Sequence, residues 1–279
     1  MAVQSVKYAG GTQTELPSKS IWADCPIAQI HEDPCIGYGI YDNFLDFGAT
    51  ATAHLGLVYE GSCTMGTAAK PGGGLAVFGT TDNEEAAIQR GAGFVIAANK
   101  TDTTAKKLWF ECCVKRSVIV TDKGAFFVGL AGEGAGIADF IADGGTDISD
   151  VDVLGFFSDP VDDVLGSHIH TITQKTGAAY DTIVDTFATV VADTYVKLGF
   201  VYDPSDTGSF SDTQRIKFYL DGVEQSTYVG EDDGDQTVYC GDTTNFPGGE
   251  EMGLLLAVKN QHADDFTTTL KWWRCYQVW

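Results

Sequence analysis

The sequence predicts an all-β protein, specifically an antiparallel jelly-roll β-sandwich. The 279 residues include 33 glycines but only 7 prolines and 3 methionines, a composition that favours tight turns and strand ends over long helices. Short β-rich runs recur between clusters of Gly, Asp, Asn and Pro, at a spacing typical of sandwiches. One pair of runs is joined by Asp221-Gly222, the dipeptide that two-residue hairpin turns demand.

The chain divides into an expected N-terminal arm and one expected domain. Residues 1–20 are rich in Gly, Thr, Ser and Gln and lack apolar periodicity, so we interpret them as an extended arm. Residues 21–279 are expected to form a single β-sandwich domain. Its predicted strands are 54–59, 75–80, 93–98, 108–117, 125–131, 153–157, 169–174, 195–202, 216–220, 223–228, 253–260 and 270–278.

Two segments carry helical signals. In residues 180–191 apolar side chains recur at helical spacing, but the Thr and Val content and the strand that follows favour β structure. We therefore predict β structure there, with a helix as the alternative. Residues 135–142 are expected to form a short helical turn between strands.

Charge excludes some classes of partner. The chain has a formal net charge of −22, and a surface this negative repels phosphate backbones and anionic lipid headgroups. Hydrophobic residues still make up 44%, so the acidity belongs to a folded surface. We therefore expect no nucleic-acid binding. We also expect no membrane binding, since no apolar run approaches the length of a membrane span. Residues 1–20 contain no apolar core of a secretory signal, so synthesis in a cytoplasm is expected.

Cysteine usage indicates a reducing compartment. The seven cysteines are an odd number with no C-x-x-C pair, and we expect small buried side chains with free thiols. Adjacent Cys112 and Cys113 should face opposite sides of one strand.

Several segments, taken in order, resemble the concanavalin A-like jelly roll of laminin-G domains and legume lectins. These segments are LWFE at 108–111, FVGLA at 127–131, YVKLGF at 195–200, FYLDG at 218–222, NFP at 245–247 and WWR at 272–274. The resemblance spans roughly residues 75–278 and implies a first strand at 42–47. The combination also looks like virion proteins of tailed bacteriophages, which serve as capsid decorations or head fibres.

This resemblance implies a non-enzymatic virion structural protein. Such a protein would dock on a major capsid protein, assemble with copies of itself and lie on the virion surface. The first alternative is a lectin-like module or adhesin that binds cell-surface glycans. The second is a glycan hydrolase, for which the sequence offers little. Asp147, Asp150 and Asp152 have mixed spacing without a Glu, and Glu111 is followed by two cysteines, so neither provides the spaced carboxylates of an ExDxxE strand.

Metal binding has two candidate sets. The resemblance to lectins implies loop carboxylates as calcium ligands, and Asp203, Asp206 and Asp212 occupy a suitable loop. His168 and His170 lie two apart on a predicted strand and so face one side, but no third ligand is tied to them by sequence. We therefore predict no metal ligands other than the three calcium candidates, and interpret the two histidines as part of a plain exposed strand face.

An aromatic cluster near the C-terminus is the candidate glycan platform. Alternation places Trp272, Arg274 and Tyr276 on one face, opposite Trp273 and Cys275. One of these faces is expected in the core. Trp272 and Tyr276 are the residues predicted to bind a ligand.

Overall fold

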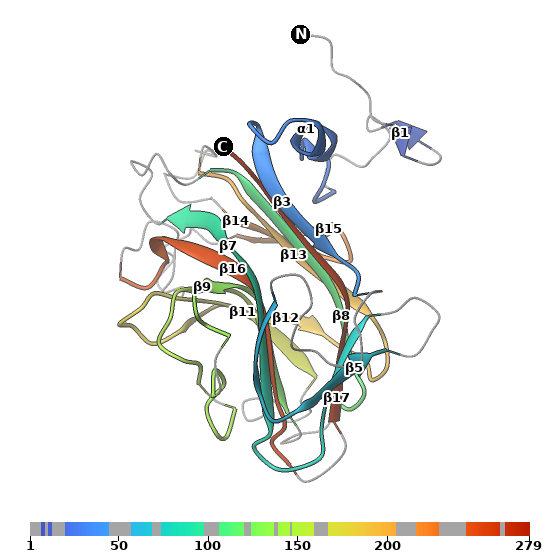
Figure 1. Ribbon diagram of the computed structural model, residues 1–279, viewed down its shortest axis with the longest axis vertical. Coiled ribbons are helices and arrows are strands. Elements are labelled where there is room, and N and C mark those ends of the chain that lie inside the picture. The colour runs from blue at the N-terminus through green and yellow to red at the C-terminus, as the bar shows by residue number, and fades with distance from the viewer. Residues whose placement is uncertain are drawn as a thin grey trace.

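The protein is an antiparallel sandwich of two β-sheets (Figure 1). The structure is a computed structural model. It describes residues 7–8, 11–12, 20–44, 57–68, 74–97, 106–119, 124–136, 139–145, 147–158, 167–204, 216–228, 244–262 and 266–279. The predicted fold class is confirmed.

The first sheet has seven strands. Their order is β12 (Asp181–Thr189), β11 (His168–Gln174), β10 (Val153–Ser158), β9 (Ala125–Gly132), β16 (Gly248–Lys259), β7 (Glu85–Ala97) and β4 (Leu57–Gly61). Every pair of neighbours is antiparallel. The order departs from chain order at β9-β16-β7, so strands distant in sequence form the centre of the sheet.

The second sheet has eight strands. Seven lie in the order β15 (Val223–Tyr228), β14 (Ile216–Leu220), β13 (Val196–Tyr202), β8 (Leu108–Arg116), β17 (Phe266–Val278), β6 (Leu75–Gly79) and β5 (Thr64–Thr67), and β3 (Gly37–Asp42) pairs with β17. Outside the two sheets, β1 (Lys7–Tyr8) pairs with β2 (Gly11–Thr12), and α1 (Ile27–Glu32) precedes β3.

The main core fills the space between the sheets. Phe110 of β8 and Phe200 of β13 stack with ring centroids 5.0 Å apart, and Phe156 of β10 meets Phe200 from the other sheet at 6.2 Å. Each fully buried Phe of this kind contributes roughly 1.5–3 kcal/mol of hydrophobic stabilisation. As alternation predicts, Trp273 and Cys275 of β17 also point into this core.

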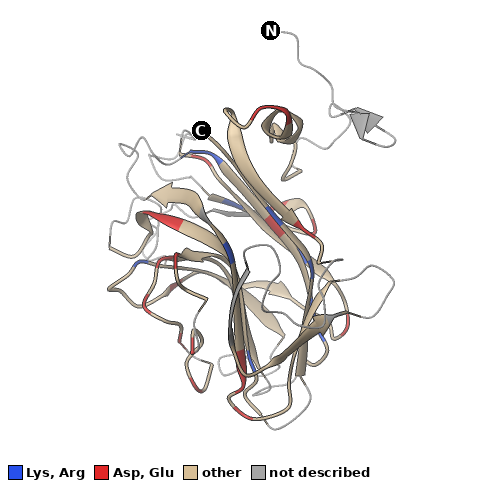
Figure 2. Ribbon diagram, in the orientation of Figure 1, with Lys and Arg blue, Asp and Glu red and all other residues tan. Residues whose placement is uncertain are grey.

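Each sheet is also partly covered on its outer face. Phe140, Ile141 and Ile148, from the loop after β9, pack on the seven-stranded sheet. Ile21 and Trp22 pack on the eight-stranded sheet. Figure 2 shows Asp and Glu along the loop between β9 and β10.

Most predicted strands lie where the sequence indicates them. The hairpin of β14 and β15 turns at Asp221 and Gly222, whose φ angles of 51° and 79° match the left-handed conformation of a type I′ turn. Residues 181–189 form β12, so the β alternative for that segment is correct.

Three expectations need correction, and one helix was not predicted. Strand β7 begins at Glu85, not at residue 93, because Gly91 and Gly93 accompany a register shift within the strand and do not end it. The strand expected at 42–47 ends at Asp42; residues 45–47 lie outside the described residues. The described part of 135–142 contains turns and a bridge from Ile141 to Ile148 where a helical turn was expected. Helix α1 was not predicted.

The described cysteines are free and buried as expected, except that Cys35 is exposed. Cys25, Cys35, Cys63, Cys112, Cys113 and Cys275 are free, and all but Cys35 are buried. Cys112 points into the core, and Cys113 lies on the opposite face. Burial raises the pKa of the Cys63 thiol to about 12 and that of Cys113 to about 11, so both side chains stay neutral at pH 7. Cys240 lies outside the described residues.

Little of the expected arm is described. Apart from the β1 and β2 residues, only Ser20 of segment 1–20 is included, and it forms an isolated antiparallel bridge with Val223. The division into arm and domain stays a prediction. No helix among the described residues is long and apolar enough to cross a membrane.

Candidate functional site

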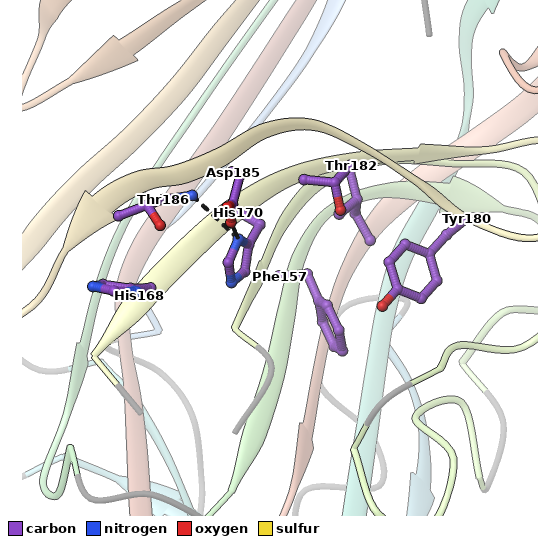
Figure 3. Close-up of a pocket in the computed structure, with 8 residues that line it drawn as sticks. Phe157, His168, His170, Tyr180, Thr182, Asp185 and Thr186 are labelled. Carbon is purple, nitrogen blue, oxygen red and sulfur yellow. Dashed lines mark hydrogen bonds and ion pairs between the residues drawn. The ribbon is translucent and has the colours of Figure 1, made fainter. Parts of the chain in front are cut away.

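A cavity of about 450 Å³ opens on the outer face of the seven-stranded sheet, at its β12 edge (Figure 3). It lies beside the cluster that covers this face, because Phe157 and Ile172 belong to both. The side chains come from three neighbouring strands and the residue before β12. They are Phe157 (β10), His168, His170 and Ile172 (β11), Tyr180, and Thr182, Asp185 and Thr186 (β12). Alternation along β11 explains why every second residue faces the cavity.

His170 holds a fixed position in this cavity. Its Nδ1 atom lies 2.8 Å from Oδ1 of Asp185 and accepts a hydrogen bond of 3.2 Å from the backbone N–H of Thr186. Its Nε2 atom is buried and has no hydrogen-bond partner among the described residues. Figure 3 shows the Nδ1 side of the ring turned towards β12 and the Nε2 side turned away from it. His170 therefore has one ring nitrogen without a hydrogen-bond partner among the described residues.

The backbone of β12 is distorted where it meets His170. The register between β11 and β12 shifts on both sides of Thr171, and Thr186 has a φ angle of 50°. A β-branched residue rarely adopts this left-handed conformation, because Cβ crowds the backbone. The distortion directs the Thr186 N–H towards His170. Such distortions concentrate near functional sites in proteins.

Two aromatic rings form the apolar part of the cavity. Phe157 and Tyr180 meet edge to face, with centroids 5.8 Å apart and planes at 67°. Phe157 is 1% exposed, whereas Tyr180 is partly exposed. The cavity thus combines a firm aromatic wall with hydroxyl, imidazole and carboxylate groups.

A second, more open groove of about 820 Å³ lies where β9, β10, β11 and β16 begin or end. Its centre is Asp152, which is 3% exposed. The Asp152 carboxylate accepts bonds from the backbone N–H and hydroxyl of Thr176 and from the N–H of Gly248. All these contacts fasten loops to the sheet, so Asp152 has a structural role.

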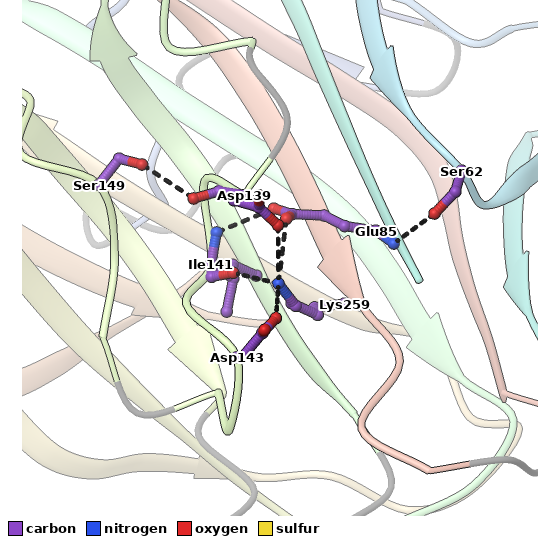
Figure 4. A network of polar contacts seen from close by, with 7 residues as sticks. All are labelled: Ser62, Glu85, Asp139, Ile141, Asp143, Ser149 and Lys259. Atoms are coloured by element: carbon purple, nitrogen blue, oxygen red, sulfur yellow. Dashed lines mark hydrogen bonds and ion pairs between the residues drawn. The ribbon is translucent and has the colours of Figure 1, made fainter. Parts of the chain in front are cut away.

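A buried polar network fixes the loop after β9 to the sheet (Figure 4). Nζ of Lys259, whose side chain is 0% exposed, lies 3.6 Å from Oε2 of Glu85, 3.2 Å from Oδ1 of Asp139 and 2.7 Å from Oδ1 of Asp143. Lys259 Nζ also donates to the Ile141 carbonyl, and the Ile141 N–H donates to Glu85.

The pKa values of Glu85 and Lys259 are both raised in this network, for different reasons. Burial raises the pKa of Glu85 to about 7, against the lowering effects of the Ile141 N–H and the charge of Lys259. Burial alone lowers the pKa of Lys259, but its hydrogen bond to Asp143 and the charge of Glu85 outweigh that effect and raise it. Lys259 therefore stays charged at pH 7, and Glu85 titrates near it.

The predicted ligand residues Trp272 and Tyr276 lie on the opposite sheet. Tyr276 is 4% exposed, meets Trp22 edge to face and bonds through its hydroxyl to Nε2 of His31. Trp272 is partly exposed and lies beside the guanidinium of Arg274, 5.2 Å from its ring centroid. The segment containing Trp22 thus covers Tyr276. The ligand role of the two residues stays a prediction.

Only one predicted calcium ligand is described. Asp203 forms an ion pair of 2.6 Å with Lys107, and Asp206 and Asp212 lie outside the described residues. The calcium role of the three aspartates stays a prediction. Within the described ranges, no group of three or more His, Cys, Asp or Glu side chains is arranged to hold a metal ion.

Sequence reasoning located only part of the cavity. The sequence predicts that His168 and His170 share one exposed strand face. The structure places both in the cavity, but His170 is buried, so the expected exposure is wrong for that residue. The sequence alone did not link either histidine to Asp185, Thr186 or Tyr180. The signal was weak because the partners belong to residues 180–191, where helical and β periodicities compete.

Comparisons with known proteins identify the fold. No family model matches the chain, and no curated protein matches it in sequence. The carbohydrate recognition domain of Emp47p superposes with a TM-score of 0.53 at 9% identity, covering 88% of this chain and 98% of that one. The potassium-bound carbohydrate recognition domain of Emp46p gives 0.55 at 12% identity, covering 84% and 94%.

Peanut lectin, solved with a nine-residue peptide, also gives a TM-score of 0.55 at 12% identity and covers 87% of this chain and 98% of its own. At these identities the likeness establishes the fold alone. The chain has the legume-lectin, concanavalin A-like β-sandwich that the sequence resemblance implies.

Proposed function

We propose that this protein is a carbohydrate-binding domain that holds a saccharide in the cavity between β10, β11 and β12 and does not alter it chemically. The observation that carries the proposal is the buried Nε2 of His170, which has no partner among the described residues and belongs to a ring fixed by Asp185 and Thr186. Binding sites for small molecules combine an apolar wall with a few oriented polar groups, and typically enclose roughly 300–1,000 Å³. The cavity has both features.

The aromatic wall suits a sugar ring. The C–H groups of a pyranose pack on aromatic faces, while its hydroxyl groups need hydrogen-bond partners at the rim. Tyr180 supplies a partly exposed ring, and Thr182 and Thr186 supply hydroxyl groups. The similarity to carbohydrate recognition domains supports this assignment at the level of the fold.

The cavity favours binding over hydrolysis. Glycosidases need two carboxyl groups, about 5–5.5 Å apart in retaining enzymes and about 6.5–9.5 Å apart in inverting ones. Among the eight described residues that line the cavity, Asp185 is the only one with a carboxylate. A non-enzymatic role is therefore part of the proposal.

A glycan array tests the proposal. The wild-type protein should bind a defined set of neutral glycans, and Tyr180→Ala should abolish that binding. Trp272→Ala is the matched control, because it also truncates a partly exposed aromatic side chain but on the other sheet. Binding lost with Trp272→Ala and kept with Tyr180→Ala would move the site to the eight-stranded sheet, and no binding to any glycan would refute the function.

The virion role implied by the sequence resemblance concerns location and stays a prediction. A protein on a particle surface, docked on a major capsid protein in several copies, can also carry a glycan site. Mass spectrometry of purified particles would show whether the chain is present in stoichiometric amounts. Its absence from particles would leave carbohydrate binding as the only role proposed.

A further inference from the structure

The outer face of the eight-stranded sheet is only partly covered. The segment that contains Trp22 lies over Tyr276 and Glu111. Farther along the same strands, the side chain of Lys115 is 26% exposed, and Tyr195, which precedes β13, is 37% exposed. This second part of the sheet is accessible to solvent, and we call it the open face. It comprises Lys115, Tyr195, Lys197, Lys271 and Trp272.

A bulge in β17 places two consecutive side chains on the open face. Leu270 and Trp273 both point into the core, and the register of β17 against β8 shifts between Leu270 and Trp272. Lys271 and Trp272 therefore both point outwards, where regular alternation would allow only one of them. The bulge thus sets an aromatic side chain directly beside a cation.

Three lysine ammonium groups gather on the open face. Lys197 on β13 is the register partner of Cys113 on β8, so the two side chains lie next to each other. Burial raises the pKa of Cys113, and the charges of Lys271 and Lys197 act against it, because both ammonium groups lie near this thiol. The Nζ atoms of Lys271 and Lys115 lie 5.1 Å and 5.4 Å from the centroid of the Tyr195 ring.

Carboxylates balance these charges only in part. Asp193 pairs with Lys115 at 3.1 Å, but its side chain is 69% exposed, so solvent weakens the pair. Asp221, in the turn between β14 and β15, accepts a bond from the backbone N–H of Lys197. No described carboxylate forms a salt bridge with the ammonium group of Lys197 or Lys271. Like charges held close together repel, and an anion on the open face would offset that repulsion.

Trp272 is held in place beside the lysines. The guanidinium of Arg274 contacts two indoles, 5.2 Å from the ring centroid of Trp272 and 4.0 Å from that of Trp22. Arg274 is fixed in turn by a hydrogen bond of 2.6 Å to the buried Glu111 carboxylate. A partly exposed Trp that is already ordered loses little conformational entropy on binding. Trp is also enriched among the residues that dominate protein–protein affinity.

We propose that the open face is a docking surface for an acidic segment of a partner protein. Lys115, Lys197 and Lys271 would pair with its carboxylates, and Trp272 would contact an apolar side chain beside them. Charge complementarity supports a partner of this kind. The chain has a net charge of −22, so a nucleic acid or an anionic membrane would also meet the rest of its acidic surface, whereas a short acidic segment meets only the open face.

The inference goes beyond carbohydrate binding and does not depend on it. The saccharide cavity lies on the seven-stranded sheet, and the open face lies on the eight-stranded sheet. Glycan binding and peptide binding are measured separately, so either proposal can fail while the other stands.

Selection from a library of random peptides tests the class of partner. The full chain is immobilised, and the peptides that bind it are sequenced. The expected result is enrichment of Asp and Glu next to an aromatic or aliphatic residue, with an affinity that falls between low salt and about 0.5 M sodium chloride. Enrichment of basic or uncharged peptides, or no enrichment at all, would overturn the proposal.

Variants then locate the binding of the strongest acidic peptide. Lys271→Gln and Lys197→Gln should each weaken it about two- to fivefold, the range for solvent-exposed ion pairs. Trp272→Ala should weaken it about tenfold or more. Lys175→Gln and Trp279→Ala are the matched controls and should bind like wild type, because Lys175 follows β11 of the other sheet and Trp279 is exposed beyond the far end of β17.

Equal affinity of wild type, Lys271→Gln and Trp272→Ala would refute the open face as the site. Thermal unfolding of each variant is the control for folding, and the two lysine variants keep the test decisive if Trp272→Ala does not fold. Two further results would replace the proposed partner. Self-association of wild type that Lys271→Gln abolishes would make the occupant a second copy of this chain. Binding of oligogalacturonate that Trp272→Ala abolishes, with no acidic peptide bound, would make it an acidic saccharide.

Discussion

Nδ1 of His170 and Oδ1 of Asp185 lie 2.8 Å apart, although the two residues belong to different strands separated by a turn. The register shifts between β11 and β12 bring them together, and the positive φ of Thr186 adds a backbone N–H to the same nitrogen. The contacts with Asp185 and Thr186 thus fix the orientation of the His170 ring on the face of the sheet.

Asp185→Asn should change which saccharides bind. The substitution keeps an oxygen near His170 but removes the negative charge that repels acidic ligands. We expect the ratio of acidic to neutral glycans bound on an array to rise relative to wild type. An unchanged ratio would show that Asp185 does not set the charge preference.

Lys259→Met should destabilise the protein markedly. The substitution leaves Glu85, which is 3% exposed, without its cation, and breaking a buried pair from one side costs about 3–5 kcal/mol. Urea unfolding measures the loss, and hydrogen exchange should show faster opening of the loop that contains Ile141. Lys115→Met is the control. It breaks a pair with the exposed Asp193, for which we expect less than about 1 kcal/mol.

The stability that depends on Glu85 should vary with pH. Burial raises its pKa in the folded state to about 7 from the ordinary value of 4.5, so the folded protein binds the proton more tightly than the unfolded chain. The contribution is fully present below pH 4.5 and is lost as the pH rises through 7. Between these limits, the free energy of unfolding of wild type should fall by about 3 kcal/mol relative to Glu85→Gln.

Urea unfolding of both proteins at several pH values tests this prediction. Taking the difference between the two removes the effect of other titrating groups that both share. A difference that stays constant, or that grows in favour of wild type as the pH rises, would contradict the assigned pKa direction.

Trp22→Phe should weaken the cover on the eight-stranded sheet. The Trp22 Nε1–H donates a bond of 2.6 Å to Glu111, a buried carboxylate that also accepts from Arg274. The ring of Phe retains most of the packing but loses the donor, so we expect a loss of about 1–3 kcal/mol in unfolding free energy. Saccharide affinity should be unchanged, because Glu111 lies on the other sheet from the cavity.

The sequence predicts local features of this fold well. Alternation places Phe110 and Cys112 in the core, and the Asp221-Gly222 turn fixes the register of β14 and β15, since these depend only on neighbouring residues. The cavity depends on how β11 is paired with β12. A register shift decides which residue meets His170, and no residue pattern in the sequence specifies it.

The same limit applies to the aromatic platform. The sequence correctly separates Tyr276 from Trp273 by face, but it does not reveal that the segment around Trp22 covers Tyr276. Contacts between segments some 250 residues apart are set by tertiary packing. The sequence can therefore identify aromatic residues that could bind a glycan, but it does not reveal which of them are exposed in the folded protein.

Mapping a bound saccharide on the protein by NMR tests the central claim most directly. Titration with the best glycan from the array should shift the backbone amides of residues 168–172 and 180–186, together with the His170 ring signals. The residues around Trp272 should be unaffected. Shifts confined to the Trp272 side of the eight-stranded sheet, with the His170 signals unchanged, would contradict the account.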